Sequence, residues 1–388
     1  MNVAYILSSA TGGGFKSFIN SLDELMKKGL SPLVVLPMEN EIHTLLSSRG
    51  IPTIIVKYRY NTYPPCTTMK DKLLFIPRLI ARIAVNYYAV CIISKMLSDK
   101  NVDIIHTNVS IIGIGHYIAQ KLHIPHVYHV REYGDLDFGY KYFPTRKHFI
   151  KQLSDDYSIF ITKDIQKYFL QDQNSKSSVI YNGIQEKESK LPEKTNNDFF
   201  LYLGDVLPAK GTDILVKAYS KYLGITKKPL PLYIVGRIAN NSYAEEIHRY
   251  IQKCNMENKV FFLPKQKDVK ALIRNACAIV IPSIKEGFGR CMPEAMFAGC
   301  LAIANNSGGS KEQLDNALKL TGQEIALHYE SPSELAGLLL QAEKMTEEEK
   351  EKYTRLAFFV VNELYSNEEN GNNVYAFYKH VLNTYGKL

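Results

Sequence analysis

Two glutamates separated by seven residues are the pair in this chain whose type and spacing suggest chemistry most directly. Glu286 and Glu294 flank a Gly-Phe-Gly segment at 287–289, and Glu294 directly follows Pro293. Carboxylate oxygens accept hydrogen bonds, so each glutamate can hold the vicinal hydroxyls of a sugar or a ribose. The two glycines let the backbone approach a ligand closely. The segment therefore predicts a site for a ligand that carries both hydroxyls and phosphate.

The elements around this pair explain how the two carboxylates would be positioned. The apolar run 278–281 predicts a buried strand. Pro293 suits the first position of a helix, where a backbone N–H has no partner to lose. Open α/β sheets bind ligands at such strand–loop–helix units, and N–H groups at a helix start bind phosphate. A solvated loop with two exposed acids is the alternative interpretation.

The order of apolar and polar segments predicts an α/β fold with two domains. Buried parallel strands are predicted at 3–7, 33–36, 53–56, 103–106 and 126–130. The polar segment 185–198 is typical of a linker. Beyond it the pattern restarts, with strands predicted at 199–203, 232–236, 260–263, 278–281 and 301–304. Two doubly wound domains with a cleft between them are therefore expected.

Positive charge is concentrated in the first half of the chain. Residues 1–187 contain 22 Lys and Arg against 15 Asp and Glu, whereas residues 188–388 contain 25 against 24. The basic and aromatic stretch 57–72 suits an anionic membrane surface or a phosphorylated substrate. Nucleic acid is not expected as a partner, because no recognised binding module appears.

Residues 73–97 form a long apolar stretch. Four polar residues interrupt it: Arg78, Arg82, Asn86 and Lys95. The stretch falls short of a clean membrane-spanning helix and predicts an amphipathic one, which either packs on a sheet or contacts anionic lipid headgroups. The six cysteines, Cys66 among them, lack zinc-site spacing, and no secretory signal is expected. A reducing, cytoplasmic location is therefore expected.

The run from Pro282 to Gly299 also resembles a known family. Its pattern, P-S-x-x-E-G-F-G-x-x-x-P-E-A-M-x-A-G, is similar to the E-x7-E signature of GT-B glycosyltransferases in the large retaining family four. Further matching segments lie at 179–184, 202–213, 234–236 and 302–312. The resemblance implies the GT-B fold, in which two Rossmann-like domains face each other across an interdomain cleft.

The same resemblance implies how the chain is divided. An N-terminal acceptor-binding domain would comprise residues 1–187 and a last helix, 371–388, that returns to it. A C-terminal domain, residues 188–370, would bind the nucleotide sugar. The returning helix would pack on the first domain through its aromatic residues, Tyr375, Phe377, Tyr378 and Tyr385.

In the second domain, the resemblance implies a role for each matching residue. Glu286 would bind hydroxyls of the donor sugar, and Glu294 would bind those of the ribose. The backbone of the loop Gly287, Phe288, Gly289 and Arg290 would hold the sugar and the diphosphate. Lys210 would neutralise the diphosphate, which suits an ammonium group on a flexible stem. Taken alone, Lys210 would be an ordinary surface lysine.

One position departs from the family pattern. Family members often have an arginine directly after the strand glycine, here Gly204, where it pairs with the diphosphate; this chain has Asp205 instead. Arg237, which follows Gly236, and Arg290 are the candidates for the missing positive charge. This hypothesis rests on their proximity to the matching motifs.

A glycine-rich loop is the first candidate in the N-terminal domain. Gly13 and Gly14 belong to Ser8–Phe15, which resembles the family's loop after the first strand. These glycines would allow close approach of the transferred sugar or the acceptor. The loop lacks the G-x-G-x-x-G spacing of a dinucleotide fold, which argues against a nicotinamide cofactor.

The segment around His129 is the second candidate. Arg131 stands where many relatives have a histidine that faces the donor sugar. His129 would share the strand face of Arg131, so both are expected to line the cleft together with Glu132. A structural histidine is the competing interpretation. His106, which ends another predicted strand, is a further candidate.

The implied activity is a retaining transfer of a sugar from a nucleotide-diphosphate sugar, UDP-sugar by family frequency. The acceptor would be a saccharide or a lipid-linked glycan in capsule, exopolysaccharide or cell-wall synthesis. No metal or cofactor is expected, although Asp135-Leu136-Asp137 spells the D-x-D metal motif of a different glycosyltransferase fold. A non-catalytic partner subunit is the alternative, which Asp205 leaves open; the signature disfavours an epimerase or a phosphorylase.

Overall fold

The structure, a computed structural model, describes residues 1–63, 68–192, 198–266 and 268–386. Cys66 and residues 193–197 of the predicted linker therefore lie outside the described residues. The chain divides into two compact units: unit 1 is Met1–Gln185 with Asn367–Leu388, and unit 2 is Glu186–Ser366. The first boundary follows Gln185, two residues before the expected limit after residue 187. The second boundary follows Ser366, four residues before the expected limit after residue 370.

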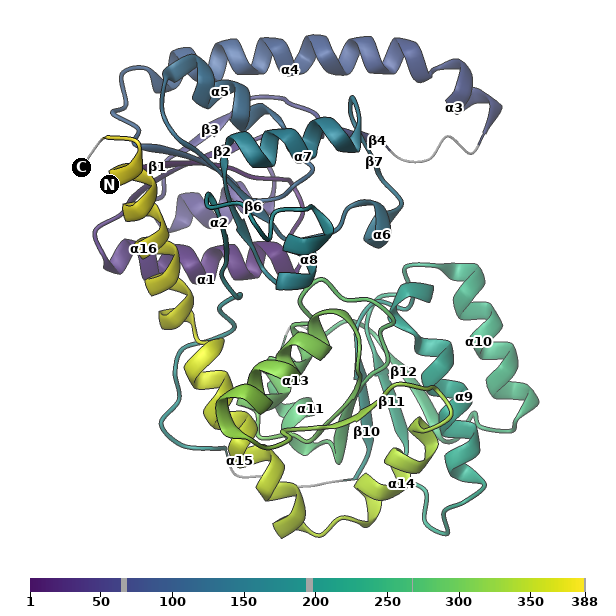
Figure 1. The fold of residues 1–388 in the computed structure, drawn as a ribbon. Coiled ribbons are helices and arrows are strands. Elements are labelled where there is room, and N and C mark those ends of the chain that lie inside the picture. The colour runs from purple at the N-terminus through teal and green to yellow at the C-terminus, as the bar shows by residue number, and fades with distance from the viewer. Residues whose placement is uncertain (64–67, 193–197, 267, 387–388) are drawn as a thin grey trace. The chain divides into compact units, whose positions relative to one another are not determined.

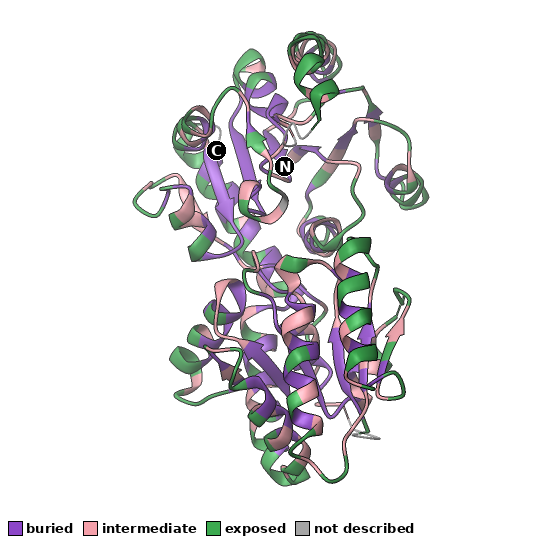
Figure 2. Ribbon diagram, turned by 90° about the vertical axis from the view of Figure 1, so that its right-hand side faces the viewer, coloured by how far each residue is buried: buried purple, intermediate pink, exposed green. Residues whose placement is uncertain are grey.

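Unit 1 is built on seven parallel strands in the order β3-β2-β1-β5-β6-β8-β9 (Figure 1). These strands are β1 (Asn2–Ile6), β2 (Ser31–Leu36), β3 (Thr53–Ile55), β5 (Ile104–Thr107), β6 (His126–Val130), β8 (Tyr157–Phe160) and β9 (Ser177–Val179). A separate antiparallel pair joins β4 (Thr62–Tyr63) to β7 (Lys141–Tyr142). Alternate side chains of β1 belong to two different core clusters, so both faces of the sheet are buried. Burial on both faces explains the continuous apolar runs of these strands (Figure 2).

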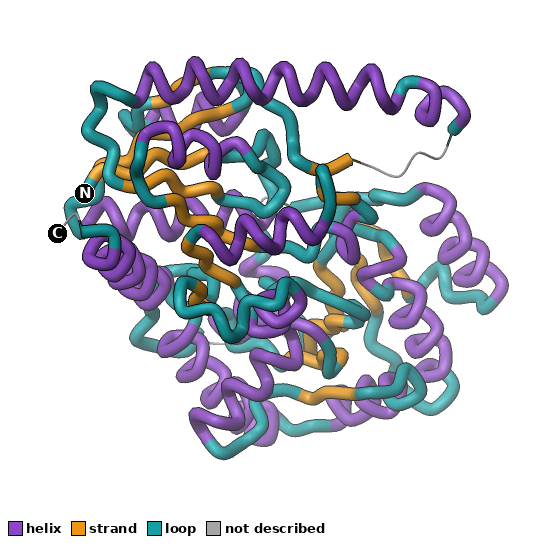
Figure 3. Tube along the Cα trace, turned by 45° about the horizontal axis from the view of Figure 1, so that its top comes forward, coloured by secondary structure: helices purple, strands orange, loops and turns teal. Residues whose placement is uncertain are grey.

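Helices cover both faces of this sheet (Figure 3). They are α1 (Gly13–Lys27), α2 (Glu41–Ser48), α3 (Met69–Leu73), α4 (Phe75–Leu97), α5 (Ile114–Leu122), α6 (Asp135–Phe138), α7 (Arg146–Asp155), α8 (Lys163–Tyr168) and α16 (Asn367–Thr384). Residues of α1, α2 and α16 pack in the cluster on one face, and residues of α4 and α5 pack in the cluster on the other.

The last helix packs on unit 1. It begins at Asn367 instead of at the predicted residue 371 and ends at Thr384. Phe377 and Tyr378 are buried in the core of unit 1. Tyr385, which was also expected to pack there, lies beyond the helix and is 46% exposed, so that part of the prediction is wrong.

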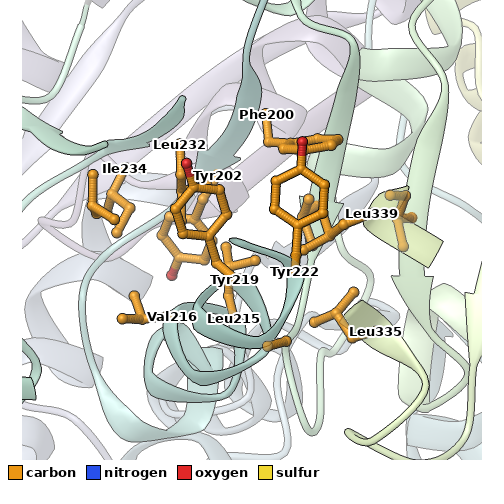
Figure 4. Close-up of a cluster of buried hydrophobic side chains, with 14 of the residues drawn as sticks. Phe200, Tyr202, Leu215, Val216, Tyr219, Tyr222, Leu232, Ile234, Leu335 and Leu339 are labelled. Atoms are coloured by element: carbon orange, nitrogen blue, oxygen red, sulfur yellow. The ribbon is translucent and has the colours of Figure 1, made fainter. Parts of the chain in front are cut away.

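Unit 2 has six parallel strands in the order β12-β11-β10-β13-β14-β15. They are β10 (Phe200–Leu203), β11 (Leu232–Val235), β12 (Val260–Leu263), β13 (Ala278–Ile281), β14 (Ala302–Asn305) and β15 (Leu327–Tyr329). The helices are the 3-10 turn η1 (Pro208–Lys210), α9 (Thr212–Leu223), α10 (Asn241–Lys253), α11 (Lys270–Asn275), α12 (Cys291–Phe297), α13 (Gly308–Thr321), α14 (Leu335–Lys344) and α15 (Glu347–Leu364). Tyr202, Tyr219 and Tyr222 dominate its core, in which α9 and α14 pack on the sheet (Figure 4).

Two local features differ from the predictions. Pro293 is the third residue of α12 rather than the first, because the helix begins at Cys291. It still lies in the first turn, where a missing N–H costs no intrahelical hydrogen bond. The apolar stretch 73–97 is divided at Leu74, where α3 ends and α4 begins.

Candidate functional site

In unit 2, the residues of the glutamate motif gather at the carboxyl ends of two adjacent strands. Lys210 follows β10 and Glu286 follows β13, and the strand order reverses between these two strands. Lys210 Nζ lies 2.6 Å from Glu286 Oε1, and Ser283 Oγ donates a hydrogen bond of 2.7 Å to the same oxygen. Open parallel sheets bind their ligands at such a reversal point. The first acid and the lysine of the sequence prediction therefore belong to one cluster.

A glycine brings Lys210 to this cluster. Gly211 has φ +66, and a Cβ there would lie 2.2 Å from the carbonyl oxygen of Pro282. Only glycine combines that left-handed conformation with so close an approach. The backbone contact between Gly211 and Pro282 thus fixes the turn that carries Lys210 beside the loop that carries Glu286.

The Gly-Phe-Gly loop is held by the first turn of α13. Gly309 donates its backbone N–H to the carbonyl oxygen of Glu286 at 2.9 Å. The amide of Gln313, which is buried, donates to the carbonyl oxygen of Phe288. A Cβ on Gly309 would lie 2.4 Å from that same oxygen, so the loop and the helix touch through their backbones. The backbone that is expected to hold a diphosphate is therefore fixed in place.

Sequence reasoning missed the role of Gln313. Gly309 falls within the matching segment 302–312, whereas Gln313 lies just outside it. A Gly-Gly pair directly after the predicted strand 301–304 was the available signal, since paired glycines often mark a close backbone contact. Nothing in the sequence marked Gln313, because its partner is a backbone carbonyl 25 residues away.

The second glutamate of the motif pairs with an arginine of the same helix start. Arg290 Nη2 and Nε each lie 3.2 Å from Glu294 Oε1. Both side chains are partly exposed, at 17% for Arg290 and 26% for Glu294. Burial raises the pKa of the adjacent Cys291 thiol to about 12, so it stays protonated and donates to the carbonyl oxygen of Leu203. Cys291 is therefore a structural thiol here.

Asp205, the departure from the family pattern, forms an ion pair with Arg237. Arg237 Nη2 lies 2.7 Å from Asp205 Oδ2. The two residues follow neighbouring strands, and the loops that carry them stay paired, because Val206 N donates to the carbonyl oxygen of Arg237 at 2.9 Å. A Cβ on Gly236 would lie 1.9 Å from the carbonyl oxygen of Gly204, which shows how closely the loops approach. The acid therefore holds a guanidinium beside the strand ends.

In unit 1, a cavity of about 370 Å³ lies at the carboxyl ends of β1, β5 and β6. The strand order of this sheet reverses between β1 and β5. The lining consists of Leu7, Ser8, Ala10, Gly12, Gly13, Gly14, Phe15, Tyr60, Asn108, Val109, Ile111, Arg131, Glu132 and Tyr140. The predicted glycine loop and two residues of the predicted histidine segment therefore share one cavity.

Arg131 and Glu132 are buried and held by named partners. Arg131 donates to the side-chain oxygens of Asn108 and Asn182, and its stem lies 3.4 Å from the position of a Cβ on Gly14. Glu132 Oε1 accepts hydrogen bonds from the backbone N–H and the hydroxyl of Ser110, at 2.8 and 2.7 Å. Burial nevertheless raises the pKa of the Glu132 carboxyl to about 7.

His129 and His106 are fully buried beside this cavity, and neither is among its lining residues. Their ring centroids lie 5.4 Å apart, and His129 Nδ1 lies 3.2 Å from the Arg131 guanidinium. His106 Nδ1 lies 2.7 Å from the hydroxyl of Tyr378 on α16. Burial, followed by the charge of Arg131, lowers the pKa of both histidines well below the usual value. Both rings are therefore neutral near pH 7, and a catalytic role for His129 stays a prediction.

Potential metal ligands in the described residues have other partners. Asp137 Oδ2 accepts from the backbone N–H of Tyr133, which stabilises a local turn, and Asp135 accepts from the hydroxyl of Tyr168, which links α6 to α8. A further group of possible metal ligands in the described residues consists of His116, His126 and Asp156. Each histidine Nδ1 lies 2.7 Å from the same Asp156 oxygen. That is a hydrogen-bond distance, whereas two ligand atoms of a tetrahedral zinc lie about 3.3 Å apart.

The chain is similar to several known proteins. The model of the family "Glycosyl transferases group 1" matches residues 183–357. An uncharacterized glycosyltransferase of Methanocaldococcus jannaschii is 26% identical over 223 residues, which cover 56% of this chain and 60% of the relative. The Escherichia coli UDP-Gal:alpha-D-GlcNAc-diphosphoundecaprenol alpha-1,3-galactosyltransferase is 23% identical over 265 residues, which cover 61% of this chain and 66% of the relative. The aligned part thus spans less than two thirds of either relative.

A solved structure shares the fold. The crystal structure of Anabaena HepE in complex with UDP superimposes with a TM-score of 0.76 at 18% sequence identity. The superposition covers 98% of this chain and 100% of that one. The fold of two Rossmann-like units is therefore shared over 98% of this chain.

Proposed function

Since residues 183–357 belong to the glycosyl transferases group 1 family and the chain has the GT-B fold, we propose that this protein is a retaining glycosyltransferase. It transfers a sugar from a nucleotide-diphosphate sugar to a saccharide or lipid-linked acceptor. The observation that carries this proposal is the Lys210–Glu286–Ser283 cluster at the reversal point of the unit 2 sheet.

Unit 2 supplies the donor half of the reaction. Glu286 accepts hydrogen bonds from the sugar hydroxyls, and Glu294 accepts them from the ribose. Lys210 and the backbone N–H groups of residues 287–290 stabilise the negative charge that grows on the leaving diphosphate. Because α13 already fixes this loop, its N–H groups need little reorganisation during the reaction.

Unit 1 supplies the acceptor half. Its cavity presents the backbone of Gly13 and Gly14 at the start of α1 and buried polar groups at Arg131 and Glu132. In a retaining transfer the leaving diphosphate takes the proton of the acceptor hydroxyl, so neither side chain must act as a base. The protein accelerates the step by holding the two substrates in position. We expect no metal to be needed, because side chains supply the positive charge that balances the leaving diphosphate.

UDP-sugar is the proposed donor, supported by HepE, whose crystal structure contains UDP. A thermal-shift comparison of UDP, GDP and ADP tests this. UDP near a hundred times its Kd is expected to raise Tm by about 5 °C or more, while Glu294→Ala, which removes the ribose contact, is expected to abolish the shift. If no nucleotide shifts Tm, the proposed donor site is wrong; a shift with GDP alone would replace uridine by guanosine.

The proposed polysaccharide pathway is supported by the Escherichia coli relative, which is named for a diphosphoundecaprenol-linked acceptor. A lipid-linked acceptor lies at a membrane surface, and we propose that this protein acts at the cytoplasmic face of that membrane. The alternative, a non-catalytic partner subunit, predicts donor binding without turnover. Release of UDP from a UDP-sugar by the purified chain would exclude that alternative.

Exchanging the two charges of the Asp205–Arg237 pair should be tolerated better than removing one. If Arg237 neutralises the diphosphate, Arg237→Ala is expected to weaken donor binding about tenfold, as expected for a lost hydrogen bond between charged groups. Asp205→Arg combined with Arg237→Asp is expected to restore most of the affinity, because the guanidinium returns to the same place from the neighbouring strand. Calorimetric titration with the nucleotide measures both effects.

Arg290→Ala serves as the comparison, since Arg290 is the other candidate for this charge. Unchanged donor affinity in both Arg237→Ala and Arg290→Ala would rule out the charge-compensation hypothesis. An affinity that falls only in Arg290→Ala would assign the charge to Arg290 and leave Arg237 as a surface ion pair, which is worth little.

A further inference from the structure

The outward face of α3 and the first half of α4 carries a continuous apolar stripe. Residues 75–88 contain no buried side chain. The apolar residues Met69, Leu73, Ile76, Ile80, Ile83 and Tyr87 follow each other at alternating intervals of four and three, and they are 49–75% exposed. This spacing places them along one side of a helix. Exposed apolar patches of this kind mark a surface that contacts a membrane or another protein.

Two polar side chains of α4 face the domain instead. Arg82 donates to the backbone oxygen of Thr62, and the side-chain amide of Asn86 exchanges hydrogen bonds with the backbone of Arg59 at 2.7 and 3.0 Å. Farther along, Ala89, Ile93 and Leu97 are buried in the core of unit 1. The helix is therefore fixed to the domain by its polar flank and its last turns, which leaves the apolar stripe outermost (Figure 2).

The helix is not placed to cross a bilayer. Among the described residues, α4 is the helix that is long and apolar enough to do so, and 11% of the relevant window is buried. Its last turns are committed to the core, so the projecting part, residues 75–88, is about 21 Å long at 1.5 Å per residue. A bilayer core is about 30 Å thick. A helix of this kind suits the plane of the interface, with its apolar side in the lipid.

The charges around the stripe favour a lipid surface over a second protein chain. Residues 69–88 contain four basic residues and one acid, Asp71, which is already paired with Arg78 at 2.9 Å. Lys70 and Lys72 are exposed at the tip. The residues beside the α4 part of the stripe, Pro77, Leu79, Ala84 and Asn86, are uncharged, whereas helix pairs usually carry opposite charges there. Tyrosines such as Tyr87 and Tyr88 are also frequent at membrane interfaces.

We propose that the face formed by α3 and the first half of α4 docks unit 1 on a membrane that contains anionic lipids. The six stripe residues enter the acyl region, and Lys70, Lys72 and Arg78 lie among the headgroups. The docking requires neither the donor site nor the transfer reaction. It would keep the acceptor domain at the surface where a lipid-linked acceptor is found.

Flotation of the full chain with lipid vesicles tests the docking. The wild-type protein is expected to float with phosphatidylcholine–phosphatidylglycerol vesicles, and less so at high salt because the charges are screened. The triple substitution Ile76→Ser, Ile80→Ser and Ile83→Ser is expected to weaken binding about tenfold or more, since it removes apolar area from the lipid. The matched control, Ile225→Ser, Leu320→Ser and Phe359→Ser, alters three similarly exposed residues of unit 2 and should bind as the wild type does.

A fluorescence measurement locates the contact. The chain contains no tryptophan, so Ile80→Trp introduces a unique probe. Its emission is expected to shift to the blue with anionic vesicles and to be quenched by brominated lipid, whereas Ile225→Trp should show neither effect.

Three results would overturn the proposal. The wild-type protein could fail to float with either neutral or anionic vesicles. The triple variant could bind as the wild type does. Light scattering could show a dimer that the triple variant converts to a monomer, which would assign the stripe to a second copy of the chain. The UDP-induced rise in Tm is measured without lipid, so its outcome is independent of the docking.

Discussion

Replacing Glu286 by glutamine is expected to leave the fold intact and reduce the transfer rate about a hundredfold. Glutamine has the same shape, but its NH₂ group cannot accept a hydrogen bond from a sugar hydroxyl. It also removes the charge that faces Lys210 at 2.6 Å, so the lysine is less well positioned for the diphosphate. Removing one preorganised contact to a transition state costs about 10²–10³ in rate.

Initial rates of nucleotide release from a sugar donor that carries the nucleotide identified by the thermal-shift comparison measure this loss as kcat/KM. Glu257→Gln, an exposed acid of the same unit, is the matched control and should behave as the wild type. Thermal melting of both variants excludes unfolding as the cause. A Glu286→Gln enzyme within about threefold of the wild type would contradict the role of this carboxylate, since such a change corresponds to less than 1 kcal/mol.

The second large effect is a pH-dependent gain in stability from Glu132→Gln. Burial raises the pKa of this carboxyl from 4.5 to about 7. Because the pKa of Glu132 is higher in the folded state than in the unfolded state, the protonated carboxyl contributes fully to stability below about pH 4.5. That contribution is lost as the pH rises through 7. At pH 8 the folded protein therefore holds a buried carboxylate, at a cost of about 3 kcal/mol.

Glutamine stays neutral and its oxygen can still accept the hydrogen bonds from Ser110, so it avoids this cost. The stability of Glu132→Gln relative to the wild type should rise by about 3 kcal/mol between pH 5 and pH 8. Amide hydrogen exchange of β5 and β6 in urea reports on unit 1 separately from unit 2. The exposed Glu39→Gln in the same unit is the control. Parallel pH profiles for Glu132→Gln and the wild type would show that Glu132 stays ionised.

Local patterns predicted those parts of the fold and site that depend on neighbours in the sequence. The strand runs and the two α/β units were predicted, because burial on both faces of a parallel sheet leaves a continuous apolar signature. The GT-B fold was implied by the resemblance of residues 282–299 to a known family. The loop between Glu286 and Glu294 was predicted because glycines, a proline and two acids fall within one short segment.

Features that depend on which strands become neighbours were not visible in the sequence. Asp205 and Arg237 pair because β10 and β11 are adjacent and their loops stay paired beyond the strand ends. The sequence suggested Arg237 as a replacement charge, but it gave no sign that Asp205 holds it. His129 was expected to line the site because of its strand face, yet it is 1% exposed and packs against His106, which Tyr378 of α16 contacts in turn.

The discontinuity of unit 1 has a consequence for biosynthesis. Val374, Phe377 and Tyr378 of α16 fill the core that β1 and α1 form at the start of the chain. A ribosome therefore releases the first 185 residues with one sheet face covered by α1 and α2 but not by α16, and completes the continuous unit 2 before α16 is made. Until α16 is made, the part of this face that it covers is an aggregation-prone surface. The nascent chain must be protected for the whole time that unit 2 takes to emerge, so the synthesis of α16 determines when unit 1 can complete its core.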